Sequence, residues 1–168
     1  LVIENARPGM TLRDLNDMVI KFYEQELPKL GLLQNGDTVR DYYYHSVSHQ
    51  LGLDCHDINC PATAKLQPGM VITVEPGLYV EQENIGIRIE NEFIVQKGTK
   101  NKYGQFMYLE TITFAPIDLD GIDPEEMSKD EIAWLNNYHK DVYEKIGPHL
   151  TDEEKEELYE FLEKILHK

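Results

Sequence analysis

The chain has 168 residues, of which 41% are hydrophobic, and a formal net charge of −15 at pH 7, so it suits one acidic domain with a hydrophobic core. This charge argues against a nucleic-acid partner, which needs basic patches, and no apolar run approaches the roughly 20 residues of a membrane-spanning helix. Two cysteines are too few for a disulfide scaffold and no signal-peptide pattern is visible, so we expect a reduced, cytoplasmic protein.

The N-terminal region is expected to hold one complete helix. Residues 1–5 lack an initiating methionine and have the character of a helix end, so we expect the chain to be a fragment of a longer protein. A helix follows over 11–27, because Thr11 is a favourable N-cap and apolar residues recur behind it at helical spacing. Pro28 and Gly31 mark its end. We interpret this helix as a structural amphipathic element.

Histidines are concentrated in one short stretch after this helix. His45, His49 and His56 are three of the six histidines in the chain, and Asp54 and Asp57 lie among them. The period of the stretch fits neither a regular helix nor a regular strand, which indicates a strand and a loop lining a cleft. A lone histidine is more often a structural hydrogen-bonding group than a ligand, but this density favours a function for at least one of them.

Alternating and β-branched residues then predict an antiparallel sheet. Strands are expected over 70–75, 85–95 and 107–114. Pro76-Gly77 breaks the first strand, which resumes over 78–80, and the polar residues that follow form a turn.

A hairpin of the first two strands, centred on Gln82 and Glu83, would place Glu75 opposite Glu90. Opposed residue numbers then add up to 165, and the two Cβ atoms would be about 4.5–5.5 Å apart. Two ionised carboxylates that close repel each other unless a cation or a shared proton lies between them. The cation is either Arg88, on the same strand face as Glu90, or a divalent metal. Glu with His suits Mn, Co, Fe or Zn better than Ca or Mg.

The alternative for these two acids is an ordinary solvated strand face. However, Glu75 ends an apolar run and Glu90 follows Ile87 and Ile89. Acids in such settings are usually partly buried and have a partner, so we expect both to be at least partly buried.

The tail from about residue 118 differs in charge, with 16 acids against 6 lysines, and so carries −10 of the total of −15. Ser128 with Glu131, and Thr151 with Glu154, have capping-box spacing and predict two helices. We interpret the acids as the solvated faces of a helical hairpin, and a partner or subunit surface is the alternative. Three histidines of the tail are expected at the surface: His139, His149 and His167.

Three stretches carry the sequence motifs, 45–57, 68–79 and 86–91, which read HSVSHQLGLDCHD, PGMVITVEPGLY and GIRIEN. In this order and spacing they resemble the pita-bread metallopeptidase family (creatinase, aminopeptidase P, prolidase and methionine aminopeptidase). The resemblance covers about residues 5–117. Residues 134–139, WLNNYH, resemble the C-terminal extension of cytosolic Xaa-Pro aminopeptidases, which makes aminopeptidase P a better match than prolidase.

The resemblance implies an α+β pita-bread fold, here incomplete. A curved antiparallel sheet would carry ligands on its concave face, and helices such as 11–27 would cover the other side. Residues 1–117 would be the C-terminal portion of the catalytic domain, and residues 118–168 an acidic helical C-terminal extension. Because such family members often dimerise, we expect a homodimer.

The family binds two divalent ions, commonly manganese, with cobalt or zinc as other candidates. By resemblance, His49 and Glu75 hold one ion and Glu90 bridges both. The two remaining family ligands are aspartates from a strand before the first helix, which this chain lacks. We therefore expect the fragment alone to be inactive.

The activity implied for the intact protein is hydrolysis of the N-terminal residue from peptides with proline in second position. The metals would lower the pKa of a bridging water, and Glu75 would help to take its proton. His45 and His56 would flank the substrate and stabilise the tetrahedral intermediate, while Arg88 would orient Glu90. The alternatives are an Xaa-Pro dipeptidase (prolidase) and a non-catalytic module of the same fold that binds peptides or partners.

Overall fold

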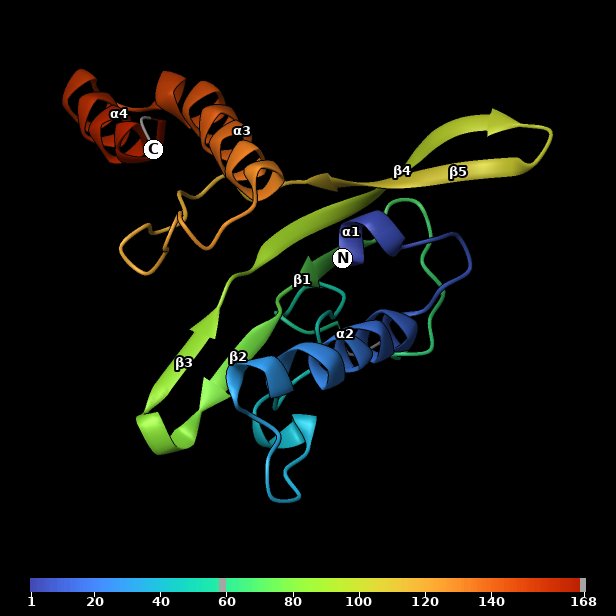
Figure 1. Ribbon diagram of the computed structural model, residues 1–168. Helices are drawn as coiled ribbons and strands as arrows, with labels where there is room; N and C mark the ends of the chain where they lie inside the picture. The colour runs from blue at the N-terminus through green and yellow to red at the C-terminus, as the bar shows by residue number, and fades with distance from the viewer. Residues whose placement is uncertain (58–59, 167–168) are drawn as a thin grey trace. The chain divides into compact units, whose positions relative to one another are not determined.

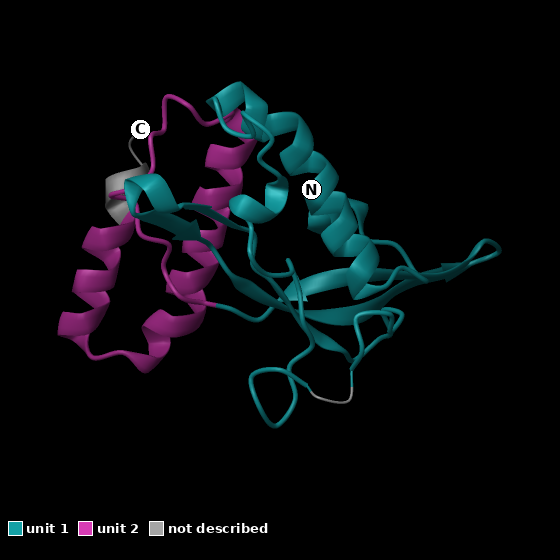
Figure 2. Ribbon diagram, turned by 90° about the horizontal axis from the view of Figure 1, so that it is seen from below, with its two compact units in different colours: residues 1–113 teal, residues 114–168 magenta. Residues whose placement is uncertain are grey.

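Two units make up the chain, residues 1–113 and 114–168 (Figure 2). The computed structural model describes residues 1–57 and 60–166. No helix of this described part is long and apolar enough to cross a lipid bilayer. The predicted domain boundary between residues 117 and 118 stays a prediction.

The first unit combines helices with two antiparallel sheets (Figure 1). One sheet has three strands in the order β1-β4-β5, and the other pairs β2 with β3. The elements in chain order are α1 (Val2–Asn5), α2 (Leu12–Glu26), β1 (Val71–Val74), β2 (Gly77–Val80), β3 (Ile85–Arg88), β4 (Asn91–Asn101) and β5 (Gly104–Thr111). The α+β class and the antiparallel pairing agree with the sequence-based expectation.

The strand register agrees with the predicted hairpin on both sides of a break. Two opposed pairs flank this break: Val74 with Asn91 in β1–β4, and Gly77 with Arg88 in β2–β3. The residue numbers of both pairs add up to 165, so the break causes no net shift of register. Glu75 and Glu90 therefore lie at the break, where the chain leaves one sheet and enters the other. The turn of the hairpin is the 3₁₀ helix Glu81–Glu83 followed by the left-handed Asn84.

The helix α2 forms because both of its ends are well defined. At its start the Thr11 hydroxyl accepts a hydrogen bond from the Asp14 backbone N–H, and the Asp14 carboxylate accepts one from the Thr11 backbone N–H. It passes into the 3₁₀ helix Leu27–Leu30 and ends at Gly31, whose φ of 78° glycine adopts without strain. Its apolar side packs against the three-stranded sheet through a shared core: Leu12, Leu15, Val19, Ile72, Phe93 and Val95. The predicted helical cover of the sheet is confirmed.

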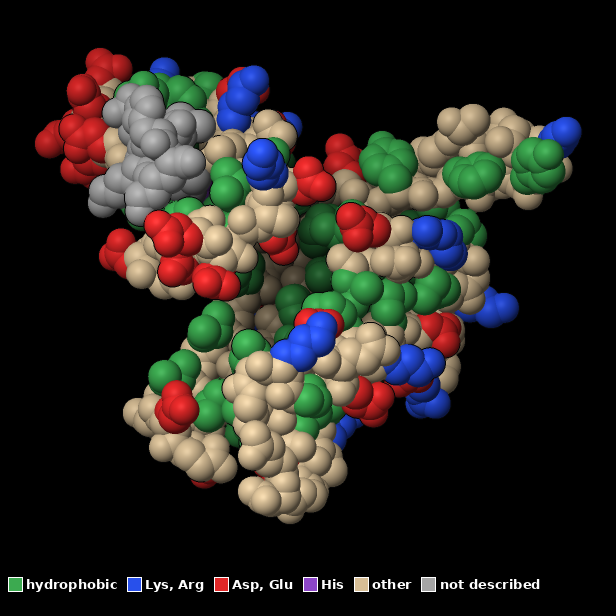
Figure 3. All heavy atoms as spheres, viewed as in Figure 1, with side chains coloured by type: hydrophobic (Ala, Val, Ile, Leu, Met, Phe, Trp, Pro, Cys, Tyr) green, Lys and Arg blue, Asp and Glu red, His purple; other side chains and the backbone are tan. Residues whose placement is uncertain are grey.

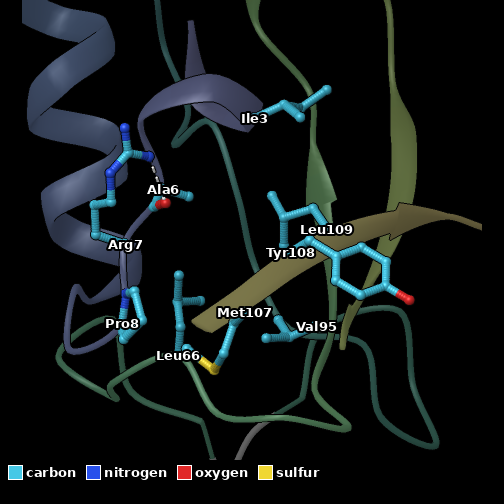
Figure 4. A pocket seen from close by; sticks show the side chains of 9 residues that line it. All are labelled: Ile3, Ala6, Arg7, Pro8, Leu66, Val95, Met107, Tyr108 and Leu109. Carbon is cyan, nitrogen blue, oxygen red and sulfur yellow. Dashed lines mark hydrogen bonds between the residues drawn. The ribbon is translucent and has the colours of Figure 1, made fainter. Parts of the chain in front are cut away.

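A pocket of about 170 Å³ opens beside α1, over β4 and β5 (Figure 4). Its lining side chains are mostly apolar: Ile3, Ala6, Arg7, Pro8, Leu66, Val95, Met107, Tyr108 and Leu109. The Arg7 guanidinium donates to the backbone carbonyls of Glu4 and Ala6, at 2.6 and 2.9 Å. No residue predicted for the site lines this pocket, so it is a separate feature.

The second unit contains the helices α3 (Lys129–Ile146) and α4 (Asp152–Leu166). Both begin at the predicted capping boxes, Ser128 with Glu131 and Thr151 with Glu154. Acidic side chains gather over α4 (Figure 3). His149, in the 3₁₀ turn Gly147–His149, is exposed as predicted, and His167 lies outside the described residues.

The predicted surface location of His139 is wrong, since its side chain is only 2% exposed. It lies on the buried side of α3, four residues after Leu135 and three before Val142, which are both buried. Its Nε2 accepts a hydrogen bond from the backbone N–H of Ile117 at 3.0 Å. Burial lowers the pKa of His139, so the imidazole stays neutral and keeps its acceptor nitrogen.

Candidate metal centre

The histidine-rich stretch runs beside β1 as an additional extended segment. Gln50 forms an antiparallel bridge with Ile72 of β1. Three backbone N–H groups continue this pairing: Leu51 donates to Val71, Thr73 donates to His49, and Glu75 donates to Val47. This pairing places His49 opposite Thr73, which lies two residues before Glu75 on the same strand face. Part of the stretch is therefore strand-like, as predicted.

A buried and a half-buried side chain of α2 hold this region in place. The Asn16 side-chain oxygen accepts hydrogen bonds from the Val47 backbone N–H and the Tyr43 hydroxyl, both at 3.0 Å. Burial raises the pKa of Tyr43, which keeps its hydroxyl proton available for donation. The Tyr23 hydroxyl donates to the backbone carbonyl of Gly77 at 3.0 Å. The helix thus fixes both the histidine segment and the strand that follows Glu75.

His49, Glu75 and Glu90 converge on one point. One ligand atom from each lies within 4.8 Å of the other two, and His49 Nε2 is 3.2 Å from Glu75 Oε1. A divalent ion with bonds of about 2.0–2.2 Å holds ligand atoms up to about 4.4 Å apart, so this spacing suits a single ion after small side-chain adjustments. One imidazole and two carboxylates form a donor set that suits Mn, Fe, Co or Zn.

The two carboxylates differ in burial. Glu75 is 8% exposed, as predicted, but Glu90 is exposed, so the predicted burial of Glu90 is wrong. Glu90 follows β3, which belongs to a two-stranded sheet and has all four of its residues exposed. Among the described residues, the ion-pair partners of Glu75 are His45 and His49, and neither carries a fixed charge. A divalent cation would relieve the repulsion between the two carboxylates.

The buried hydroxyl of Thr73 links two of the candidate ligands. It donates to Glu75 Oε1 at 2.9 Å and accepts from the backbone N–H of His49 at 3.0 Å. Hydrogen bonds of this kind fix the orientation of a ligating carboxylate. The sequence interpretation gave Thr73 no role, although its position two residues before Glu75 places both side chains on one strand face.

His45 joins the site through Glu75 and Tyr79. Its Nδ1 is 2.9 Å from the Ser46 carbonyl oxygen and 3.8 Å from Glu75 Oε2, while its Nε2 is 2.8 Å from the Tyr79 hydroxyl. A carbonyl oxygen only accepts, so Nδ1 carries a proton, and in this tautomer Nε2 accepts a hydrogen bond from the Tyr79 hydroxyl. A Cβ at Gly77 would lie 2.8 Å from His45 Nε2 and 2.7 Å from the Tyr79 oxygen, so glycine is required there. Tyr79 is a second contact that the sequence interpretation missed.

The two remaining predicted residues lie at the edge of the centre. His56 is exposed, and its ring lies edge-to-face on that of His49, with 4.3 Å between ring centroids. Arg88 is exposed as well, and within the described residues no ion pair connects it to Glu75 or Glu90. The structure therefore brings together every predicted site residue except Arg88.

Comparison with known proteins gives two family matches. The model of metallopeptidase family M24 matches residues 1–97, and that of the C-terminal region of peptidase M24 matches residues 105–166. The chain is 36% identical to human Xaa-Pro aminopeptidase 3 over 104 residues, which cover 52% of this chain and 20% of that protein. It is 40% identical to Xaa-Pro aminopeptidase 1 of Dictyostelium discoideum over 116 residues, which cover 63% of this chain and 18% of that protein.

A solved structure extends the likeness to the tail. The X-prolyl aminopeptidase of Caenorhabditis elegans, a cytosolic enzyme with a di-nuclear active site, superposes with a TM-score of 0.69 at 27% identity. This match covers 95% of this chain and 25% of that chain. The chain spans between 16% and 26% of the length of the curated relatives that it matches.

Proposed function

This chain belongs to metallopeptidase family M24 and has part of the pita-bread fold, and we propose that it forms part of the active site of an Xaa-Pro aminopeptidase. The proposed reaction removes the N-terminal residue from a peptide whose second residue is proline. The convergence of His49, Glu75 and Glu90 at the break between two sheets is the observation that carries this proposal. The relatives named as Xaa-Pro aminopeptidases support the choice of substrate.

The proposed centre takes two divalent ions, for which we favour manganese. When bound, such ions provide a water of lowered pKa and polarise the scissile carbonyl. His49 and Glu75 would hold one ion, and Glu90 would contact both. Three ligands cannot saturate two ions, so the centre needs further protein ligands, for which the family resemblance implies two aspartates.

Glu75 is the best placed proton acceptor of the site. Its Oε1 accepts a hydrogen bond from the Thr73 hydroxyl and lies 3.2 Å from His49 Nε2. Its Oε2 lies 3.8 Å from His45 Nδ1. This arrangement leaves one carboxylate oxygen to receive a proton from the attacking water. We therefore assign Glu75 two roles, ligand and proton acceptor.

His45 and His56 are proposed to lie on either side of the substrate. The Tyr79 hydroxyl and the Ser46 carbonyl fix the orientation of His45, and His45 would stabilise the developing oxyanion by exchanging one of these hydrogen bonds for one to the substrate. His56 is exposed beside His49 and is free to approach a bound peptide. The assignment of Arg88 as the residue that orients Glu90 remains a proposal that rests on the resemblance.

The direct test is the hydrolysis of an Xaa-Pro-Xaa tripeptide by the intact protein in the presence of Mn²⁺. We expect release of the first residue, and no release from a matched peptide with alanine in second position. Cleavage of an Xaa-Pro dipeptide in preference to the tripeptide would instead identify a dipeptidase. An absence of hydrolysis with Mn²⁺, Co²⁺ and Zn²⁺ would contradict the proposal.

We extend the proposal to assembly and location. The intact protein is proposed to form a homodimer in the cytosol, as the description of the Caenorhabditis elegans relative as a cytosolic enzyme suggests for location. Sedimentation equilibrium and cell fractionation test these two points, and a monomer or a secreted protein would contradict them.

A further inference from the structure

A second group of metal-binding atoms lies next to the first. His49 Nδ1 or Nε2, Cys55 Sγ and one ring nitrogen of His56 lie within 4.8 Å of one another. This set has one sulfur and two nitrogen donors, whereas the first has one nitrogen and two carboxylate donors. The two sets share only His49. The second contains a thiol, a softer ligand than the carboxylates of the first, so the two sets prefer different metal ions.

The loop between Gln50 and Asp57 creates this second set. The Asp57 backbone N–H donates to the Gln50 carbonyl at 2.9 Å, which closes the loop at its base. Gly52 allows the closure, because a Cβ there would lie 3.1 Å from Asp57 Cβ. The chain therefore folds back and carries Cys55 and its neighbour over the ring of His49, and the contact between the His49 and His56 rings is one result.

We propose that His49, Cys55 and His56 form a second metal site, which takes thiophilic ions such as Zn²⁺ and Cd²⁺. Thiolate and imidazole ligands select such ions, whereas carboxylates suit Mn²⁺. Three protein ligands with a water as the fourth is a common arrangement for zinc. Cys55 is a free thiol and is exposed, so an ion can reach it. On binding, the Cys55 thiol releases its proton to solvent and its sulfur bonds to the ion as a thiolate.

The shared histidine makes the two sites compete. His49 Nδ1 lies 3.3 Å from the Gln50 carbonyl oxygen, which only accepts a hydrogen bond, so Nδ1 carries the proton and Nε2 is the ligand atom of both sets. An ion held by Cys55 and His56 therefore withdraws His49 from Glu75 and Glu90. A thiophilic ion should therefore inhibit the peptidase. This consequence rests on the proposed function, whereas the binding site itself does not.

The binding test is titration of the reduced, metal-free protein with Co²⁺, followed by ultraviolet absorption. A thiolate bonded to Co²⁺ gives a charge-transfer band that nitrogen and oxygen ligands do not give. Cys60, the only other cysteine of the sequence, supplies the matched control. We expect the band in the wild type and in Cys60→Ser, and at least a tenfold weaker band in Cys55→Ser. Glu90→Gln should keep the band, because Glu90 belongs to the other set of ligands.

Three results would overturn the site: no band in the wild type, an undiminished band in Cys55→Ser, or loss of the band in Cys60→Ser or Glu90→Gln. Inhibition of the intact protein then tests the competition. Cys55→Ser should raise the inhibitory Cd²⁺ concentration at least tenfold relative to Cys60→Ser, and an unchanged value would overturn the competition. A band without any Mn²⁺-dependent hydrolysis would contradict the proposed function and leave the second site supported.

Discussion

Each unit has a histidine that is at least half-buried, but the surroundings of the two rings differ. In the first unit, half-buried His49 faces the carboxylate of Glu75 at 3.2 Å. In the second unit, His139 is more deeply buried, at 2% exposure, and faces a backbone N–H. His139, the more deeply buried ring, accepts a hydrogen bond from the backbone. His49, the less buried ring, faces a carboxylate with which it can share a metal ion. Burial alone therefore does not identify a functional histidine, and the group opposite the ring does.

The acids of the two units support the same conclusion. The tail carries −10 of the net charge, and the acids of α4 between residues 152 and 160 are exposed, as expected for a solvated helix face. Glu75 is one acid in the first unit, yet it is buried and lies against two histidines. The position of the candidate centre is therefore determined by the strand register, which brings Glu75 and Glu90 together, and not by the number of acids in a region.

The largest expected effect is that of Glu75→Gln, which removes a proposed ligand and proton acceptor from the first unit. We expect kcat/KM of the intact protein for an Xaa-Pro peptide to fall by about 10²- to 10⁴-fold, the range for a positioned proton-transfer group. Glu83→Gln, at an exposed acid in the turn of the same hairpin, is the matched control and should keep wild-type activity. Equal activity of the two variants would contradict the site.

The next effect is on stability and belongs to the second unit. His139→Ala leaves the Ile117 N–H without its partner and opens a cavity, so the free energy of unfolding should fall by about 2–4 kcal/mol. Denaturant unfolding followed by the fluorescence of Trp134, the single tryptophan and part of α3, measures this change. The exposed His149→Ala should change stability by less than about 0.5 kcal/mol. Equal losses in both variants would remove the distinction between the two histidines.

A pH titration sharpens the same comparison. Burial depresses the folded-state pKa of His139 below the ordinary histidine value of 6.5, so the unfolded chain binds the proton more readily. The contribution of His139 to stability is therefore present above about pH 6.5 and is lost as the pH falls, by at most about 1.4 kcal/mol per pH unit. The Trp134 unfolding midpoint should fall in acid, and His139→Gln should show a weaker fall. If the unfolding midpoint fell with decreasing pH equally steeply in the wild type and in His139→Gln, the assignment of this pH dependence to His139 would be wrong.

The smallest effect concerns the partner of His45. Tyr79→Phe removes the hydroxyl that lies 2.8 Å from His45 Nε2, and the loss of one neutral hydrogen bond is worth about 0.5–1.5 kcal/mol. We expect kcat/KM to fall by about 2- to 13-fold. Tyr44 stacks on Tyr79, so Tyr44→Phe keeps the stacking and should leave activity unchanged. If Tyr44→Phe had the larger effect, the role given to Tyr79 would be wrong.

Local patterns made part of the structure predictable. The capping boxes and the hairpin register depend on residues close in sequence, and both appear as predicted. The constant register across Pro76 explains why Glu75 and Glu90 meet at the break. The burial of His139 was predictable too, because Leu135 and Val142 place it on the buried side of a helix.

Other features depend on contacts that the sequence pattern does not encode. The exposure of Glu90 and the lack of an acidic partner for Arg88 among the described residues reflect the two-stranded sheet that holds β3. The contact of Tyr79 with His45 needs the close approach that Gly77 permits, which only the packed structure reveals.

Equilibrium dialysis of Mn²⁺ against the purified metal-free chain tests the central claim most directly. If His49, Glu75 and Glu90 share an ion, the wild type and Glu83→Gln bind Mn²⁺ alike, and Glu75→Gln and Glu90→Gln each bind at least tenfold more weakly. Manganese binding that is the same in all four proteins, or absent from the wild type, would contradict the claim that these residues form a metal centre.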